Sequence, residues 1–228
     1  MSHTPTAYAF SWQPSPLQFA LFPEHCKAKM SDYLENRSGR WKHKFPVNET
    51  KINYWRQKVG PDFEHMHHYC AGLGYLMQAQ SPSYKRKRYA YKRAQQEIAY
   101  TIGRSQPKSP LWLEMNIAQA KAKAGQRKWN LAITQLKRLQ ALYPSSPEVY
   151  ITVAQIFKRQ GKTEKAIAAL EDGMKSASKK GPLLFYLARY YYEIGDISKA
   201  AELTPIAEAH GMKMDSLKAR LPTPDDTK

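Results

Sequence analysis

Small residues recur along the chain with a fixed spacing of 34 residues. Gly161 and Gly195 are one such pair, and three pairs of alanines keep the same spacing: Ala154 with Ala188, Ala166 with Ala200, and Ala132 with Ala166. Small residues recur where two helices cross closely, and glycine recurs where a helix ends in the left-handed conformation. The pattern therefore predicts a series of similar helical hairpins.

The clearest predicted hairpin covers residues 147–180, with its turn at Gly161. Apolar residues at helical spacing form a stripe in each half: Tyr150, Val153, Ala154 and Phe157, then Ala166, Ala169 and Leu170. Neighbouring hairpins are expected at 109–146 and 181–211. In the first, Gly125 precedes Ala132 by seven positions rather than five, which predicts a turn two residues longer. In the second, Pro205 is expected to kink or shorten the last helix.

This arrangement of glycines, alanines and apolar positions resembles that of tetratricopeptide repeat proteins over residues 109–211. The resemblance implies an all-α fold, a right-handed superhelical solenoid of stacked hairpins. The chain departs from the family pattern where Tyr150 and Leu184 stand in place of an early tryptophan. Pro205 is a further departure, as expected of a terminal repeat.

Weaker helical patterns flank the predicted repeats. Residues 62–80 and 84–104 predict a degenerate hairpin within 61–108, and helices at 24–35 and 48–59 would form an N-terminal cap at 24–60. Residues 1–23 contain Pro14, Pro16 and Pro23 and indicate an extended arm rather than a helix. Residues 212–228 would form a C-terminal cap and tail. Such caps are expected because each repeat leaves an apolar face that a neighbour must bury.

Composition excludes several classes of protein. The chain has 228 residues, 42% of them hydrophobic, which is enough for a core and excludes wholesale disorder. No apolar run approaches the roughly 20 residues that span a bilayer, so no transmembrane segment is expected. The net charge is +17, and residues 111–180 alone carry +8 whereas those from 181 onward carry −1. The positive charge favours acidic partners.

Two cysteines, Cys26 and Cys70, suit either one disulfide bridge or two buried free thiols in a cytosolic protein. The N-terminal third also resembles a set of uncharacterised bacterial tetratricopeptide proteins that carry export signals. It shares with them a cysteine after a proline-rich arm, a Trp-Arg segment and a His-Met-His-His-Tyr-Cys run. This resemblance implies a periplasmic or extracellular location and a Cys26–Cys70 bridge, with a cytoplasmic location as the alternative.

No pattern typical of a catalytic site is present, so we expect neither enzymatic activity nor a cofactor. The densest group of potential ligands is the run Glu64 to Cys70, in which His65 and His68 share one helical face. Together with a thiolate, and with His25, Cys26 or His43 as the fourth ligand, these two histidines could hold zinc or copper. The spacing matches no established metal motif, and packing of the imidazoles is the favoured interpretation.

In tetratricopeptide stacks the first helix of each hairpin lines a groove in which partner peptides lie. The resemblance implies that one protein partner, extended or acidic, would bind there, and that the chain is a non-catalytic scaffold or adaptor in an exported bacterial assembly. The paired Lys and Asn that hold chaperone carboxylates are absent. The expected groove residues are Trp112, Met115, Gln119, Lys123, Ile151, Gln155, Lys158, Arg159, Phe185, Arg189 and Tyr192.

Two alternative functions remain open. A basic patch interleaved with tyrosines could bind nucleic acid or an anionic polysaccharide. It consists of Lys85, Arg86, Lys87, Arg88, Lys92 and Arg93. The chain could instead self-associate head to tail as a structural subunit, because the open ends of a solenoid are surfaces of different kinds.

Overall fold

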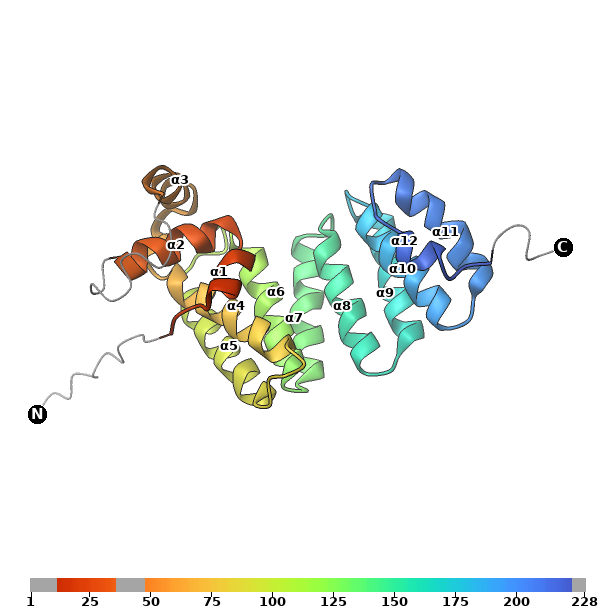
Figure 1. Cartoon of the computed structure of the whole chain (residues 1–228), viewed down its shortest axis with the longest axis horizontal. Coiled ribbons are helices and arrows are strands. Elements are labelled where there is room, and N and C mark those ends of the chain that lie inside the picture. The colour runs from red at the N-terminus through yellow and green to blue at the C-terminus, as the bar shows by residue number, and fades with distance from the viewer. Residues whose placement is uncertain (1–11, 36–47, 223–228) are drawn as a thin grey trace, which may run out of the picture. The chain divides into compact units, whose positions relative to one another are not determined.

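A computed structural model describes residues 12–35 and 48–222, and within these ranges every regular element is helical. The chain divides into two compact units, Met1–Gln126 and Arg127–Lys228. Neighbouring helices pack as pairs inside each unit (Figure 1), which confirms the prediction of an all-α fold with packed helix pairs. Among the described helices, none is long and apolar enough to cross a membrane.

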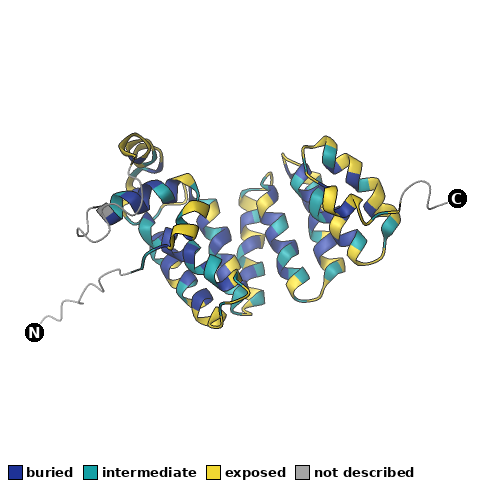
Figure 2. Cartoon of the chain, in the orientation of Figure 1, coloured by how far each residue is buried: buried dark blue, intermediate teal, exposed yellow. Residues whose placement is uncertain are grey.

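The first unit is built around α4, α5 and α6, which pack against one another in succession, while α2 packs against α3 and α4. Its core contains Met30, Tyr69, Ile98 and Met115, all fully buried. In Figure 2 the outer helix α3 is largely exposed, and only Ile52 and Val59 of this helix are buried. The helices are α1 (Pro16–Leu21), α2 (Glu24–Glu35), α3 (Glu49–Val59), the 3-10 helix η1 (Gly60–Glu64), α4 (Met66–Gln80), α5 (Lys87–Ile102) and α6 (Trp112–Gly125).

The expected extended arm at 1–23 is wrong for part of its length. Pro16–Leu21 forms the short helix α1, because Ser15 and Gln18 make a reciprocal capping box and Pro16 occupies the first helical position, where its missing N–H costs nothing. The segment is docked on α4. The side-chain amide of Gln18 donates a buried hydrogen bond of 2.8 Å to the carbonyl of Gly74. Residues 1–11 lie outside the described part of the chain.

Cys26 of α2 and Cys70 of α4 form a disulfide bridge, with their Sγ atoms 2.07 Å apart and both side chains fully buried. The pairing joins the N-terminal cap to the central helix pair of the first unit. The alternative of two free thiols does not hold in this structure, since neither cysteine is free.

The second unit is a run of helices in which each packs against the next. Pairs α8–α9 and α10–α11 make the most extensive contacts, and α10 also packs against α8 and α9. The repeated alanines Ala154, Ala166, Ala188 and Ala200 are all fully buried at these helix contacts. The helices are α7 (Trp129–Leu142), α8 (Pro147–Arg159), α9 (Thr163–Ser176), α10 (Gly181–Glu193), α11 (Ile197–Ala209) and α12 (Asp215–Lys218).

Three successive interhelical connections have the same length and the same conformation. Residues 126–128, 160–162 and 194–196 each link two helices, and the middle residues Arg127, Gly161 and Gly195 have φ values of 62°, 74° and 86°. The longer turn expected after Gly125 is therefore wrong. The left-handed position is Arg127, which restores the five-residue spacing to Ala132 and keeps the 34-residue period.

Pro205 does not shorten the helix that contains it. α11 runs through Pro205 to Ala209 and has 13 residues, as many as α10. The hydroxyl of the preceding residue, Thr204, donates a hydrogen bond of 2.7 Å to the carbonyl of Ala200. The expected shortening is wrong.

Candidate functional site

The groove residues expected on α8 and α10 lie on two neighbouring helices of the second unit. The side-chain amide of Gln155 donates a hydrogen bond of 2.9 Å to the hydroxyl of Tyr186, and Lys158 forms an ion pair with Glu193. Ile151 packs against the core of this unit. The guanidinium of Arg159 lies 5.7 Å from the ring centre of Trp129 on α7. These contacts fix α8 against its neighbours.

Phe185, Arg189 and Tyr192, the three residues expected on α10, line one cleft. Together with Glu193 they form one wall. The opposite wall comes from the C-terminal segment that contains α12, through Lys213, Met214, Ser216, Leu217 and Arg220. Met214 and Leu217 are buried against Leu184 and Ala188 of α10, so the short helix is held in place by its own apolar face. The structure therefore brings a set of residues from 185 to 220 into one concave site.

The cleft combines an aromatic surface with unpaired positive charge. Arg189, Lys213 and Arg220 are exposed, and no ion pair involves them within the described residues. The guanidinium of Arg189 lies 5.2 Å from the ring centre of Phe185. Among the described residues, Glu193 is the one carboxylate that lines the cleft, and Lys158 neutralises it. The site can thus accept a carboxylate from a ligand next to an apolar or aromatic group.

The sequence did not reveal two of these cations. Lys213 and Arg220 fall in a segment expected to be a neutral cap and tail, and their contribution depends on the way residues 213–220 fold back on α10. The available signal was the apolar pair Met214 and Leu217 between them, three residues apart as on one side of a helix.

The groove residues expected on α6 belong to the first unit. Met115 is fully buried in that unit's core and is not accessible to a ligand. Trp112 is half-buried, and the ammonium of Lys123 donates a hydrogen bond of 3.2 Å to the side-chain oxygen of Gln119. The candidate cleft consists of residues of the second unit alone.

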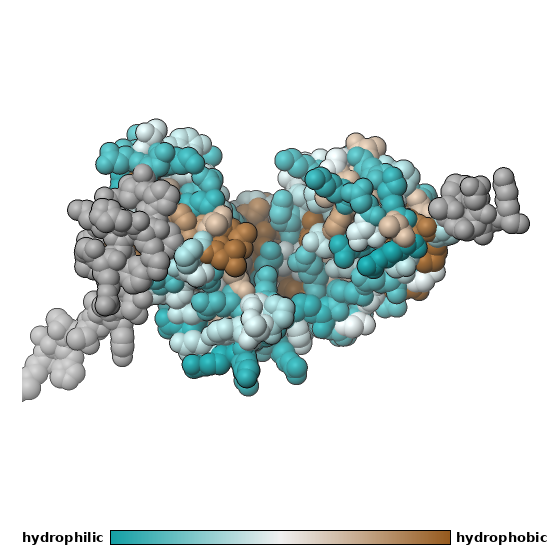
Figure 3. All heavy atoms as spheres, in the orientation of Figure 1, coloured by the Kyte–Doolittle hydropathy of each residue, from teal (hydrophilic) through white to brown (hydrophobic). Residues whose placement is uncertain are grey.

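The basic patch expected in the first unit separates into two parts. Lys85, Arg86, Lys87, Arg88 and Lys92 are exposed and are called the α5 basic patch below. Arg93 is different, because its guanidinium donates a hydrogen bond of 2.5 Å to Glu97. Figure 3 shows a hydrophilic surface at the lower edge of the first unit, where α5 begins in Figure 1.

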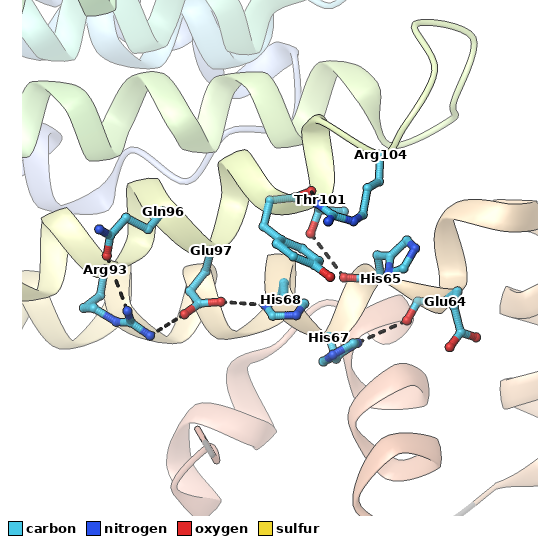
Figure 4. A network of polar contacts seen from close by, with 10 residues as sticks. Glu64, His65, His67, His68, Arg93, Gln96, Glu97, Thr101 and Arg104 are labelled. Atoms are coloured by element: carbon cyan, nitrogen blue, oxygen red, sulfur yellow. Dashed lines mark hydrogen bonds and ion pairs between the residues drawn. The ribbon is translucent and has the colours of Figure 1, made fainter. Parts of the chain in front are cut away.

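The histidine run of α4 forms a polar network with α5 (Figure 4). Nδ1 of His68 lies 2.6 Å from the carboxylate of Glu97, which also accepts a hydrogen bond from Arg93. Nδ1 of His67 lies 3.1 Å from the carbonyl oxygen of Glu64. Burial, then His68 and Lys29, lower the pKa of His67 to about 3. Among the described residues no three His, Cys, Asp or Glu side chains are placed to hold a metal ion, and the disulfide removes the thiolates. His43 lies outside these residues.

A second polar group joins α2, α4 and α6, in which Tyr69 and His25 are buried while Glu114 is partly exposed. The hydroxyl of Tyr69 donates a hydrogen bond of 2.6 Å to Glu114, and Nε2 of His25 lies 3.4 Å from the same oxygen without the alignment of a hydrogen bond. Burial raises the pKa of Glu114, but the contacts with His25 and Tyr69 outweigh it and hold the pKa below its usual value. Burial, with Glu114, raises the pKa of Tyr69. Tyr69 thus remains a donor to an ionised carboxylate, and the contact joins the core residue Tyr69 to Glu114 on the surface.

No protein-family model, curated protein or solved structure matches this chain.

Proposed function

We propose that the chain is a non-catalytic interaction module of the tetratricopeptide type. Its second unit would bind an acidic, extended segment of a partner protein in the cleft between α10 and α12. The observation that carries the proposal is the cluster of three unpaired cations, Arg189, Lys213 and Arg220, around an aromatic wall.

The repeat geometry supports the assignment to the tetratricopeptide type. Left-handed residues at Arg127, Gly161 and Gly195 keep the 34-residue period, and each ends a helix of 13 or 14 residues. A superhelical solenoid is the arrangement that such equal hairpins would generate when they stack.

The chemistry of the cleft supports an acidic partner with an apolar side chain. Phe185 and Tyr192 provide apolar area, since both are partly buried against Leu217 and Met214. The three cations lie on both walls, so an extended peptide would meet positive charge on either side. A rigid helical frame needs little reorganisation on binding, which preserves affinity.

The disulfide supports an exported location for the module. Disulfides persist in the periplasm and outside cells and are rare in the bacterial cytosol. A buried bridge between Cys26 and Cys70 therefore favours a periplasmic or extracellular assembly over a cytoplasmic one.

Fluorescence anisotropy with a synthetic peptide tests the proposal. The probe is a fluorescein-labelled peptide with three glutamates on each side of one phenylalanine, and its partner peptide carries glutamines instead. The intact chain should bind the glutamate peptide at least about tenfold more tightly than the glutamine peptide, because close charge pairs contribute strongly to recognition. Arg189→Glu with Arg220→Glu should abolish this preference.

The matched control, Lys137→Glu with Lys165→Glu, reverses the charge of two exposed lysines outside the cleft. It changes the net charge by the same amount as the cleft variant. The control should retain the preference for the glutamate peptide. If both double variants lost this preference equally, binding would depend on overall charge and the cleft assignment would be overturned. Equal affinity of the wild-type chain for the two peptides would overturn it as well. Phe185→Ala should weaken binding of the phenylalanine peptide but not of a version with alanine in its place.

A further inference from the structure

We propose that the α5 basic patch of the first unit is a binding site for an anionic polysaccharide. This site lies in a different unit from the α10–α12 cleft and does not depend on the function proposed for that cleft. It consists of Lys85, Arg86, Lys87, Arg88 and Lys92.

The charge of this patch is not neutralised within the described residues. All five side chains are exposed, and none of them takes part in an ion pair there. Arg86 has one side-chain contact, with its guanidinium 4.5 Å from the ring centre of Tyr89. Arg93, one residue beyond the patch, is by contrast paired with Glu97. The five patch cations therefore differ from Arg93 of the same helix, since none has an acidic partner among the described residues.

The surrounding sequence offers almost no carboxylate to the patch. Between Glu64 and Glu114 the chain holds eight Lys and Arg residues and a single acidic residue, Glu97. Glu97 is buried and contacts both Arg93 and His68. On α2 of the same unit, Asp32 pairs with Lys29 and Arg56. The five cations therefore remain available to an external polyanion.

The arrangement of the cations suits a chain with regularly repeated anions. Lys85 to Arg88 are consecutive, and Lys92 lies four residues after Arg88 on the same face of α5. Like charges at this spacing repel one another, and cations in the first turn of a helix oppose its dipole. The isolated helix is destabilised by both effects, and a bound polyanion would reverse both.

The exposed surface excludes base stacking as the main source of affinity. Of the three tyrosines in this segment, Tyr91 is buried and Tyr84 packs against the core, which leaves Tyr89, 43% exposed and in contact with Arg86. Proteins that bind single-stranded nucleic acid use several exposed aromatic rings in succession. The single exposed ring of Tyr89 could stack on a sugar ring as well as on a base, so it does not favour nucleic acid.

Two further observations favour a polysaccharide. Among residues 81–93, Tyr89 is the one large apolar side chain that is exposed, so nothing here could enter a bilayer. The disulfide ties α2 to α4, the helix that packs most closely on α5, and disulfides indicate an oxidising compartment. Polysaccharides with carboxylate or sulfate groups are the polyanions that a protein meets there.

Binding of fluorescein-labelled heparin to the intact chain tests the proposal. The patch variant is Lys85→Glu/Lys87→Glu/Arg88→Glu, and the matched control with the same net charge is Lys137→Glu/Lys165→Glu/Lys179→Glu. The patch variant should lose at least about tenfold in affinity and the control less than about threefold, and the salt dependence should become shallower only in the patch variant. Because glutamates are favourable in the first turn of a helix, the patch variant should melt no lower than the wild-type chain.

The same titration with an oligothymidylate and with vesicles rich in phosphatidylserine identifies the class of polyanion. Heparin should bind more tightly than either at physiological salt. Tighter binding of the oligothymidylate or of the vesicles would overturn the assignment to polysaccharide. Equal loss of heparin affinity in the patch and control variants would overturn the site itself.

Discussion

Gly125 lies directly against the ring of Tyr91: a Cβ atom at this glycine would be 2.2 Å from Cδ1 of Tyr91. Gly125 is thus required by the close approach of α6 to α5 rather than by a turn. The neighbouring Gln126 strengthens the same contact, since its amide donates hydrogen bonds to the carbonyl of Tyr91 and to Gln95.

Replacement of this glycine should destabilise the first unit. Gly125→Ala forces the ring of Tyr91 to move, and overpacking of this kind costs about 1–3 kcal/mol, partly offset by the better helix propensity of alanine. Urea unfolding followed by circular dichroism measures the loss. Lys121→Ala, an exposed change in the same helix, should alter stability by less than about 0.5 kcal/mol. Unchanged stability of Gly125→Ala would contradict the close contact.

Arg127→Gly should have the opposite effect. Arg127 has a φ of 62°, a conformation that costs a residue with a side chain about 1–2 kcal/mol and costs glycine nothing. Glycine also raises the conformational entropy of the unfolded chain, which offsets part of this benefit. The free energy of unfolding should therefore rise by roughly 0.5–1 kcal/mol. The matched change Gly161→Ala should lower stability, since Gly161 has the same conformation at φ 74°. Thermal melting compares the two, and a lower melting temperature for Arg127→Gly would contradict the assignment of the turn.

Loss of the disulfide should lower the stability of the first unit considerably. The bridge closes a loop with a sequence separation of 44, which corresponds to about 3–4 kcal/mol in the chain-entropy model. Urea unfolding of Cys26→Ala/Cys70→Ala measures this loss. A reducing agent should destabilise the wild-type chain and leave the double variant unchanged. Identical urea midpoints for the two proteins would contradict a stabilising bridge.

Acid should destabilise the fold through His67. Its pKa is about 3 in the folded protein, while an unfolded histidine titrates near 6.5, so between these values the unfolded chain binds more protons. Stability should therefore fall as the pH falls from about 6.5 towards 3, by at most about 1.4 kcal/mol per pH unit and by less once solvent screening of this partly exposed ring is included.

The variant His67→Phe isolates this effect. Phenylalanine can keep the stacking on Tyr33, whose ring centre is 4.2 Å away, but it cannot take up a proton. Urea midpoints measured across this pH range should depend less on pH in His67→Phe than in the wild-type chain. His210→Phe, at an exposed position, serves as the control. An equally steep pH dependence in His67→Phe would refute the role of His67.

Pro205→Ala should stabilise α11. Pro205 is exposed within a continuous helix and cannot donate a hydrogen bond to the carbonyl of Ala201. Alanine restores this donor, and the gain should approach but not exceed about 3 kcal/mol. Thermal melting of Pro205→Ala and of the exposed control Glu202→Ala measures the difference. A lower melting temperature for Pro205→Ala would show that the proline is needed by its surroundings.

The helix pattern could be predicted because it depends on local spacing. The apolar stripe and flanking residues indicated helices at 24–35 and 147–159 closely, since amphipathic periodicity and capping are properties of neighbouring residues. Local rules were misleading at Pro16, where proline signalled an extended arm although a capping box at Ser15 made it the first residue of a helix.

Residue patterns were enough to predict the all-α class and the left-handed turns at Gly161 and Gly195, because these follow from residues close together in the chain. The 34-residue period could be read from the recurrence of small residues at that spacing. The packing of the helices decided that Cys26 and Cys70 are bridged rather than free, and that Met115 is buried. It also brought Glu97 to both His68 and Arg93, and Lys213 and Arg220 to Arg189 around one cleft. Such relationships depend on which helix faces meet, and a periodic pattern places a residue on a face without specifying what packs against it.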